Sequence, residues 1–213
     1  MARNYELDTT AAKDANSGGK RITEPGPYVG TFRAAWGEVN DKGTESVCLI
    51  FVSEQGQEVG PLALYTHNGK GEALPSYKTL NAIMACMKQR KLTATKGKVK
   101  LYDFDAQADV EREKQTYPEL VGPKIGLVLQ GEEYENRSGE VKVRMIVAAP
   151  FDASTRRMAD EVLTSAPEAK SLDRFLGWFE GHKVKPLRAN GGRNAGGKPA
   201  PASADFIDDE IPF

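Results

Sequence analysis

Residues 44–53 read TESVCLIFVS, and six consecutive apolar residues, Val47 to Val52, give this run high β-strand propensity. Turn-forming sequences bound it, with Asn40-Asp-Lys-Gly43 before it and Gln55-Gly-Gln57 after it. A strand between two such turns is typical of an antiparallel meander. The run therefore predicts a central strand with a strand on either side.

The flanking sequences fit that prediction. Residues 28–36 alternate, with Tyr28, Phe32 and Trp36 on one parity, and residues 58–67 form a third β-prone run. The period then changes, because Tyr77, Leu80, Ile83, Met84 and Met87 form a helical stripe within residues 75–90. We expect three strands followed by a helix.

A β-hairpin is predicted after a long intervening segment. We interpret residues 91–119, first Lys/Gly-rich and then acidic, as an elaborated loop with a short strand around residues 99–104. Residues 124–130 and 140–148 read as strands joined by the turn Asn136-Arg-Ser-Gly139. In the second strand Val141, Val143, Met145 and Val147 share one face, and Lys142 and Arg144 take the other.

Two helices are expected next. One covers residues 154–163, and the other covers residues 165–180, where Ser165 and Glu168 have capping-box spacing. Beyond residue 183 a Gly/Pro/Ala/Asn/Lys composition cannot supply a core. We predict a loose arm (1–24), a folded domain (25–183), a disordered linker (184–204) and a tail (205–213).

The order of these elements predicts a mainly β (α+β) fold. Three strands, a helix and two strands match a five-stranded Greek-key barrel of the oligonucleotide-binding (OB) type, with its helix between the third and fourth strands and additional C-terminal helices. Several other small β folds share this order.

Charge is distributed unevenly over the 213 residues, so the formal net charge of −1 says little about partners. Residues 185–204 carry four basic residues and no acidic one, whereas residues 205–213 carry four acidic residues and no basic one. Residues 88–100 add six more cations without an acid. Binding of a polyanion remains compatible with this pattern.

The sequence offers little for catalysis. Cys48 and Cys86 lie in apolar runs and are predicted to be buried, reduced thiols. His67 and His182 have no triad or zinc spacing, and the acidic stretch 103–113 has no ligand spacing, so we expect no enzyme, metal or cofactor. No apolar run is long enough to span a membrane and the N-terminus has no export signal, which predicts a cytoplasmic protein.

The last nine residues combine acidic groups with an apolar end. Phe213 carries the terminal carboxylate, Ile211 and Pro212 precede it, and Asp205, Asp208, Asp209 and Glu210 supply the charge. Such a peptide suits a partner with an apolar pocket rimmed by Lys or Arg, and Pro212 limits the entropy lost on docking. The other interpretation is a solubilising tail, which would need no apolar terminal residue.

This tail resembles that of bacterial single-stranded DNA-binding proteins, which end in an Asp-Phe-Asp-Asp-Asp-Ile-Pro-Phe pattern. Asp208, Asp209, Ile211, Pro212 and Phe213 match, Glu210 is a conservative substitute, and Phe206 and Ile207 depart from the pattern. The opening Pro25-Gly-Pro-Tyr-Val-Gly-Thr-Phe32, the long helix and the extra C-terminal helices look more like the divergent members encoded by bacteriophages.

The resemblance implies an OB fold, no enzymatic activity, a place in the host cytoplasm and roles in DNA replication, recombination and repair. It implies that the tail recruits a polymerase, primase, helicase or nuclease, and that it competes with DNA for the binding groove. A homo-oligomer is compatible with it. The alternative is a recombination mediator or strand-annealing adaptor whose body binds protein rather than single-stranded DNA.

A sequence-tolerant binder of single strands needs cations for phosphates and rings for bases. Lys142 and Arg144 are the better candidates, because alternation places both opposite an apolar row. The remaining cation candidates are Arg33, Lys96, Lys98 and Lys100, where the lysine run reads equally well as a solvated loop. Trp36, Tyr65, Tyr102 and Tyr134 are the stacking candidates, whereas Trp178 and Phe179 are predicted to pack.

Overall fold

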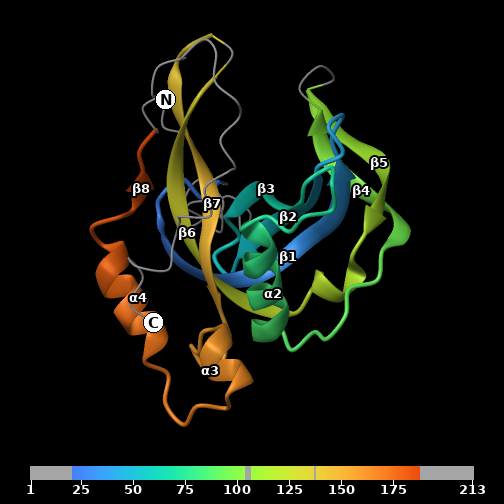
Figure 1. Ribbon diagram of the computed structural model, residues 1–213. Helices are drawn as coiled ribbons and strands as arrows, with labels where there is room; N and C mark the ends of the chain where they lie inside the picture. The colour runs from blue at the N-terminus through green and yellow to red at the C-terminus, as the bar shows by residue number, and fades with distance from the viewer. Residues whose placement is uncertain (1–20, 104–106, 137, 188–213) are drawn as a thin grey trace, which may run out of the picture.

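The computed structural model describes residues 21–103, 107–136 and 138–187 (Figure 1). It is mainly β, as predicted, and its strands form one eight-stranded sheet. The predicted arm, linker and tail fall largely or wholly outside the described residues. The partner-binding candidates among residues 205–213 therefore have no structural description.

Strand β1 (Gly26–Val39) organises the sheet because both of its edges are occupied. One edge pairs with β2 (Glu45–Ser53), and the other pairs first with β6 (Lys124–Glu135) and then with β5 (Ala108–Thr116). A register shift between Phe32 and Ala34 marks a β-bulge where the partner changes. One long, bent strand thus joins two separate hairpins.

The remaining elements enclose the main core. Strand β3 (Glu58–His67) pairs with β2, and β7 (Val141–Phe151) pairs with β6. Helix α2 (Ser76–Cys86) contacts both β3 and β7, which also contact each other. Leu80, Ile83 and Met87 from the predicted stripe are buried, but the helix ends earlier than predicted and Tyr77 is exposed.

Strand β2 is buried on both faces, which explains its continuous apolar run. Val47, Leu49 and Phe51 join the main core. Cys48 and Ile50 face the other way into a second cluster that contains Ala34, Trp36 and Val99. Both cysteines are free and buried, as predicted, and burial raises the pKa of Cys86 to about 12.

The structure corrects the predicted loop over residues 91–119, because the short strand expected around residues 99–104 is part of a longer β-hairpin. The segment holds a hairpin of β4 (Thr95–Asp103) and β5, paired in continuous register from Thr95↔Thr116 to Asp103↔Ala108, followed by the short 3-10 helix η1 (Pro118–Leu120). Val99 and Leu101 pack on the outer face of β1 and β2, so this hairpin supplies the layer that covers the second face of β2.

The C-terminal helices are shorter than predicted. Helix α3 (Ala159–Leu163) begins late because the Asp152 carboxylate accepts hydrogen bonds from the Ser154 and Thr155 amides and holds a turn there. Helix α4 (Ser171–Phe179) begins six residues after Ser165, which has a positive φ of 54°. Its first amides bond to the buried Glu161 carboxylate, so the predicted Ser165–Glu168 capping box is wrong.

The folded part extends beyond the predicted domain boundaries at residues 25 and 183. Ile22 is buried, and its backbone amide donates a hydrogen bond to the Glu58 backbone carbonyl at 2.9 Å. Strand β8 (Val184–Lys185) pairs in parallel with β6. Within the described ranges, none of the helices has the length and apolar character needed to cross a lipid bilayer.

Candidate nucleic-acid interface

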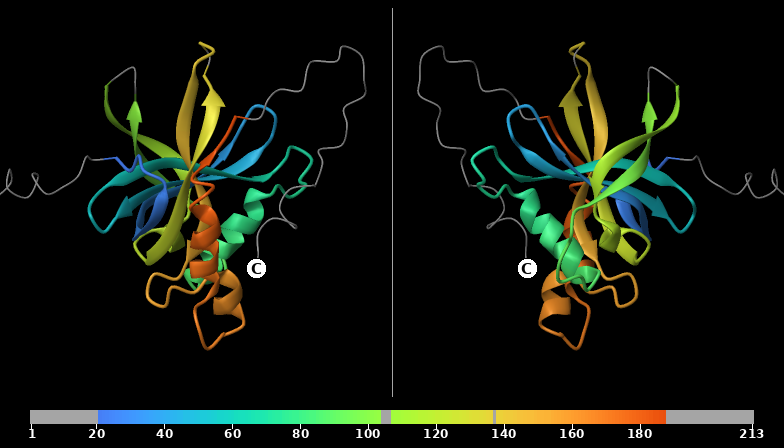
Figure 2. Two further views of the ribbon diagram at one scale, coloured as in Figure 1. Left: turned by 90° about the vertical axis from the view of Figure 1, so that its left-hand side faces the viewer. Right: turned by 90° about the vertical axis from the view of Figure 1, so that its right-hand side faces the viewer.

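Two hairpins, β4–β5 and β6–β7, project from the end of the sheet opposite α3 (Figure 2). Between them they carry seven of the ten DNA-binding candidates: Lys96, Lys98, Lys100, Tyr102, Tyr134, Lys142 and Arg144. The two hairpins differ in the charges and rings that share a face with these candidates.

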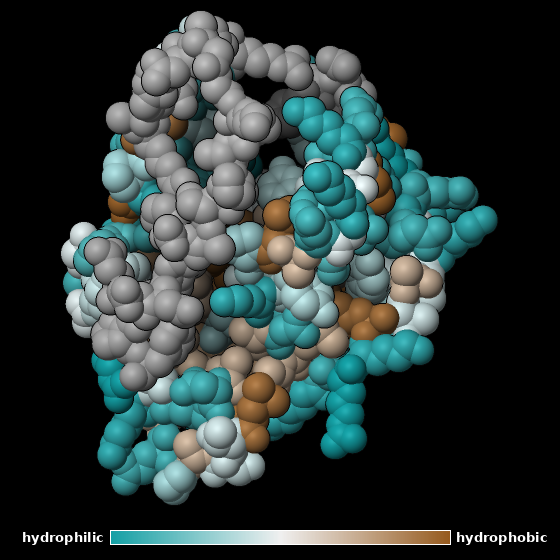
Figure 3. All heavy atoms as spheres, in the orientation of Figure 1, coloured by the Kyte–Doolittle hydropathy of each residue, from teal (hydrophilic) through white to brown (hydrophobic). Residues whose placement is uncertain are grey.

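The lysine row of β4 (Lys96, Lys98 and Lys100) faces an acidic strand. Lys98 lies opposite Glu113, Lys100 opposite Glu111, and the exposed Tyr102 opposite Asp109. The Lys98 ammonium lies 3.5 Å from the Glu111 carboxylate. The visible surface of this hairpin is mostly hydrophilic (Figure 3). Opposite charges alternate across it, so its net field for a phosphate chain is small.

A hollow of about 510 Å³ lies on the same hairpin, lined by Lys96, Lys98, Lys114 and Glu113 with Gly97 and Gln115. The Lys114 ammonium forms an ion pair with the Glu38 carboxylate at 2.8 Å. The hydrogen bond from Lys114 and a second from the Trp36 indole hold the pKa of Glu38 below its usual value, despite burial. With Lys98 paired as well, Lys96 is the lining lysine without an ion pair to a described residue.

Two other candidates have structural roles. Arg33 makes a bidentate pair with Glu58, with its Nε and Nη2 each 2.9 Å from a carboxylate oxygen. Trp36 is 2% exposed beneath the β4–β5 hairpin, so its ring offers no face to a base in this conformation. Tyr65 is 44% exposed on β3, where it lies opposite Ser46.

The β6–β7 hairpin brings the other candidates together. Its register places Tyr134 opposite Lys142 and Glu132 opposite Arg144, so all four share one face. The alternation predicted this shared face for Lys142 and Arg144. The Arg144 guanidinium carbon lies 5.5 Å from the centre of the Tyr134 ring, within cation–π range. Lys142 and Arg144 are about half exposed.

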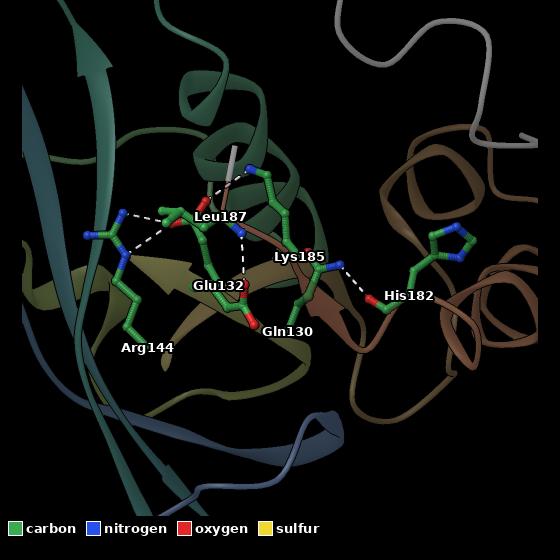
Figure 4. Close-up of polar contacts among 7 residues, drawn as sticks. Gln130, Glu132, Arg144, His182, Lys185 and Leu187 are labelled. Carbon is green, nitrogen blue, oxygen red and sulfur yellow. Dashed lines mark hydrogen bonds and ion pairs between the residues drawn. The ribbon is translucent and has the colours of Figure 1, made fainter. Parts of the chain in front are cut away.

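Strand β8 adds a cation to this face. Lys185 lies opposite Glu132 in the parallel register, and its ammonium is 2.9 Å from the Glu132 carboxylate (Figure 4). We call the group of Tyr134, Lys142, Arg144, Lys185 and Glu132 the basic face. It contains three cations, one carboxylate and one ring, and the exposed Glu140 borders it through an ion pair with Lys142 at 3.3 Å.

An aromatic stack lies where β8 leaves α4. The His182 and Trp178 rings are parallel within 10° and their centres are 4.2 Å apart. Gln130 of β6 donates to the His182 carbonyl at 2.6 Å (Figure 4), and Gln130 shares the strand parity of Glu132 and Tyr134. Residues 130–134 of β6 span about 13 Å. Tyr134 lies at one end, Gln130 bonds to the His182 backbone at the other, and Glu132 with its two cations lies between them.

Sequence reasoning missed Glu132, Gln130, His182 and Lys185. A signal for Glu132 was present, because the four-residue turn at Asn136–Gly139 fixes the register that sets Glu132 opposite Arg144. Lys185 was assigned to the linker by composition. A two-residue strand has no periodicity of its own to reveal it.

No protein-family model matches this chain, and no curated protein matches it significantly. Its described residues contain no group of three or more His, Cys, Asp or Glu side chains arranged to hold a metal ion. The case for function therefore rests on the chain's own residues.

Proposed function

We propose that this protein binds single-stranded DNA through the basic face, without strong sequence preference. The observation that carries the proposal is the arrangement of Arg144 over Tyr134 beside Lys142 and Lys185, on a hairpin that projects beyond the core. Cations that follow phosphates and rings on which bases stack are the two requirements of such a site.

We also propose that the fold is an OB barrel with one insertion. In support, β1, β2 and β3 form the meander, α2 follows, β6 returns to β1, and β7 contacts β3. The β4–β5 hairpin is then an insertion between the helix and the fourth strand. In OB folds the loop between the fourth and fifth strands binds oligonucleotides, and here that position is the β6–β7 hairpin.

The C-terminal peptide, residues 205–213, is proposed to recruit replication, recombination and repair enzymes. Its support is the sequence pattern, an acidic segment ending in Ile211, Pro212 and Phe213. Together the two proposals describe a non-catalytic protein that protects single strands and brings enzymes to them.

The test of DNA binding is a titration of a dye-labelled 30-nucleotide deoxythymidine oligonucleotide with the full-length protein at two salt concentrations. With one to three phosphate contacts available on the basic face, the slope of log affinity against log salt concentration should lie between about −0.7 and −2. Mixed-sequence single strands should bind comparably and duplex DNA more weakly. Failure to bind deoxythymidine in dilute buffer would overturn the proposal and favour the protein-binding adaptor.

The test of the tail compares the full chain with a variant lacking residues 205–213, using purified bacterial primase, helicase, polymerase and nuclease as probes. Oligonucleotide affinity should hold or rise in the truncated chain, and enzyme binding should disappear. Enzyme binding that survives the truncation would reject the recruiting role.

A further inference from the structure

Glu132 occupies the centre of the basic face. Its Oε2 accepts hydrogen bonds from Arg144 Nε at 3.0 Å and Arg144 Nη2 at 2.7 Å, while Oε1 accepts from Lys185 Nζ at 2.9 Å (Figure 4). Two of the three cations proposed to meet DNA are therefore already bound to one carboxylate of the protein.

The donors in this contact are those that a phosphate oxygen would use, because Arg144 Nε and Nη2 converge on one oxygen of Glu132. Arg presents the same planar fork to carboxylate and phosphate oxygens, and it binds either through two parallel N–H donors. Burial alone would raise the pKa of Glu132, but the hydrogen bonds from Arg144 and Lys185 outweigh burial and lower it. At neutral pH the carboxylate is an anion in the place a phosphate would take.

The cations are more accessible than the carboxylate between them. The side chains of Arg144 and Lys185 are 55% and 45% exposed, against 19% for Glu132. A phosphate group can thus approach both cations from solvent while Glu132 holds them from the protein side.

The position of Lys185 does not depend on Glu132. The Gly131 amide donates to the Lys183 carbonyl at 2.9 Å, and the Leu187 amide donates to the Glu133 carboxylate at 3.0 Å. These contacts hold β8 against β6 on both sides of Lys185. Removing the Glu132 charge should therefore free the cations without detaching the strand.

We infer that Glu132 is an internal competitor for DNA phosphates, which weakens binding to the basic face so that a bound strand can be released. This inference rests on the proposed function. An incoming phosphodiester would replace the carboxylate on Arg144 and Lys185. Glu132 thus regulates affinity by competing for the cations rather than by touching the strand.

The experiment compares Glu132→Gln with Glu140→Gln in the full-length protein, with the 30-nucleotide deoxythymidine probe at several salt concentrations. Both variants remove one negative charge from the same hairpin. Among the described residues, however, Glu140 forms an ion pair with Lys142 alone, accepts a hydrogen bond from Asn136, and has a side chain that is 64% exposed. We expect Glu132→Gln to bind about tenfold more tightly and to steepen the salt slope by about 0.7 to 1.4, the effect of one or two added phosphate contacts. Glu140→Gln should change affinity less than threefold.

Two further variants make the result specific. In the Arg144→Gln background, adding Glu132→Gln should increase DNA affinity much less than it does in the wild type, because Arg144 is one of the two cations that Glu132 binds. Glu132→Asp keeps the charge but shortens the reach, and it should give an intermediate gain even if Glu132→Gln folds poorly.

The outcomes separate the two proposals. If the wild-type protein binds the probe and Glu132→Gln binds no better than Glu140→Gln, the inference fails while the proposed function stands. If neither wild type nor Glu132→Gln binds, both fail. Binding by Glu132→Gln alone would support the competitor role and show that wild-type affinity is lower than proposed.

Discussion

The β4–β5 and β6–β7 hairpins carry similar rows of cations, but different strands face them. The lysine row of β4 lies opposite Glu111 and Glu113, so charges cancel across the hairpin. On β6–β7, Lys142 lies opposite Tyr134, and Arg144 and Lys185 share a single carboxylate. The number of cations on a strand is thus a poor guide to a polyanion site, since the register decides what remains unneutralised.

The largest expected effect comes from neutralising matched pairs of cations. Lys142→Gln/Arg144→Gln should lower affinity for deoxythymidine oligonucleotides about 100-fold, because two charge-assisted contacts are worth about 1.5 kcal/mol each. Lys98→Gln/Lys100→Gln should lower it less than threefold. Fluorescence anisotropy at low salt measures both, and equal losses would show that strand charge matters and register does not.

The hairpins should also differ in their contribution to stability. Val99→Ala in β4 should lower the free energy of unfolding by about 2 kcal/mol, because Val99 is buried against β1 and β2. Val143→Ala in β7, at a site 56% exposed, should change it by less than about 0.5 kcal/mol. Urea titrations give both values, and similar losses would contradict the view that the β6–β7 end projects free of the core.

A smaller difference is expected between the two tyrosines. Tyr134→Leu should weaken binding about tenfold, within the roughly 1–3 kcal/mol of a stacked base, and leave the salt slope unchanged because no charge is lost. Tyr102→Leu should have little effect. A greater loss for Tyr102 than for Tyr134 would move the binding surface to β4–β5.

The smallest effect concerns pH. The pKa of Glu38 is lowered by its hydrogen bonds from Lys114 and Trp36, so its contribution to stability is full above its unfolded pKa and fades as the pH falls through the folded value. Glu38→Gln should therefore flatten the decline in stability below about pH 4.5, by less than about 1 kcal/mol because the pair is partly exposed. Thermal melts between pH 3 and 7 measure this, with Glu113→Gln as the control. If Glu38→Gln leaves the dependence of stability on pH unchanged, Glu38 does not stabilise the β4–β5 hairpin.

Periodicity predicted the meander, the helix and the β6–β7 hairpin, because each has an apolar pattern of its own, and turns that contain Asn or Gly separate the strands. Sequence reasoning missed the β4–β5 hairpin because β4 has few apolar residues, with Val99 buried and Leu101 partly buried among lysines and Gly97. A clue existed in residues 47–52, since six apolar residues in a row imply a strand buried on both faces and hence a further layer.

The candidate site was predictable in part. Alternation placed Lys142 and Arg144 on one face, which the structure confirms. It could not reveal that Trp36 is buried, because the covering hairpin was read as a loop. Nor could it supply Lys185 and His182, since the path of residues 182–187 along β6 is set by tertiary hydrogen bonds rather than by local pattern.

The second cluster is small and separate from the main core, with Val99 and Leu101 as the side chains that β4–β5 contributes. Such a unit can open without global unfolding. Backbone amides that pair β4 with β5 should accordingly exchange with deuterium through a lower-energy opening than those of β2. The hairpin would then behave as a separate cooperative unit, so its loss would expose Trp36 and change its fluorescence before the rest of the chain melts.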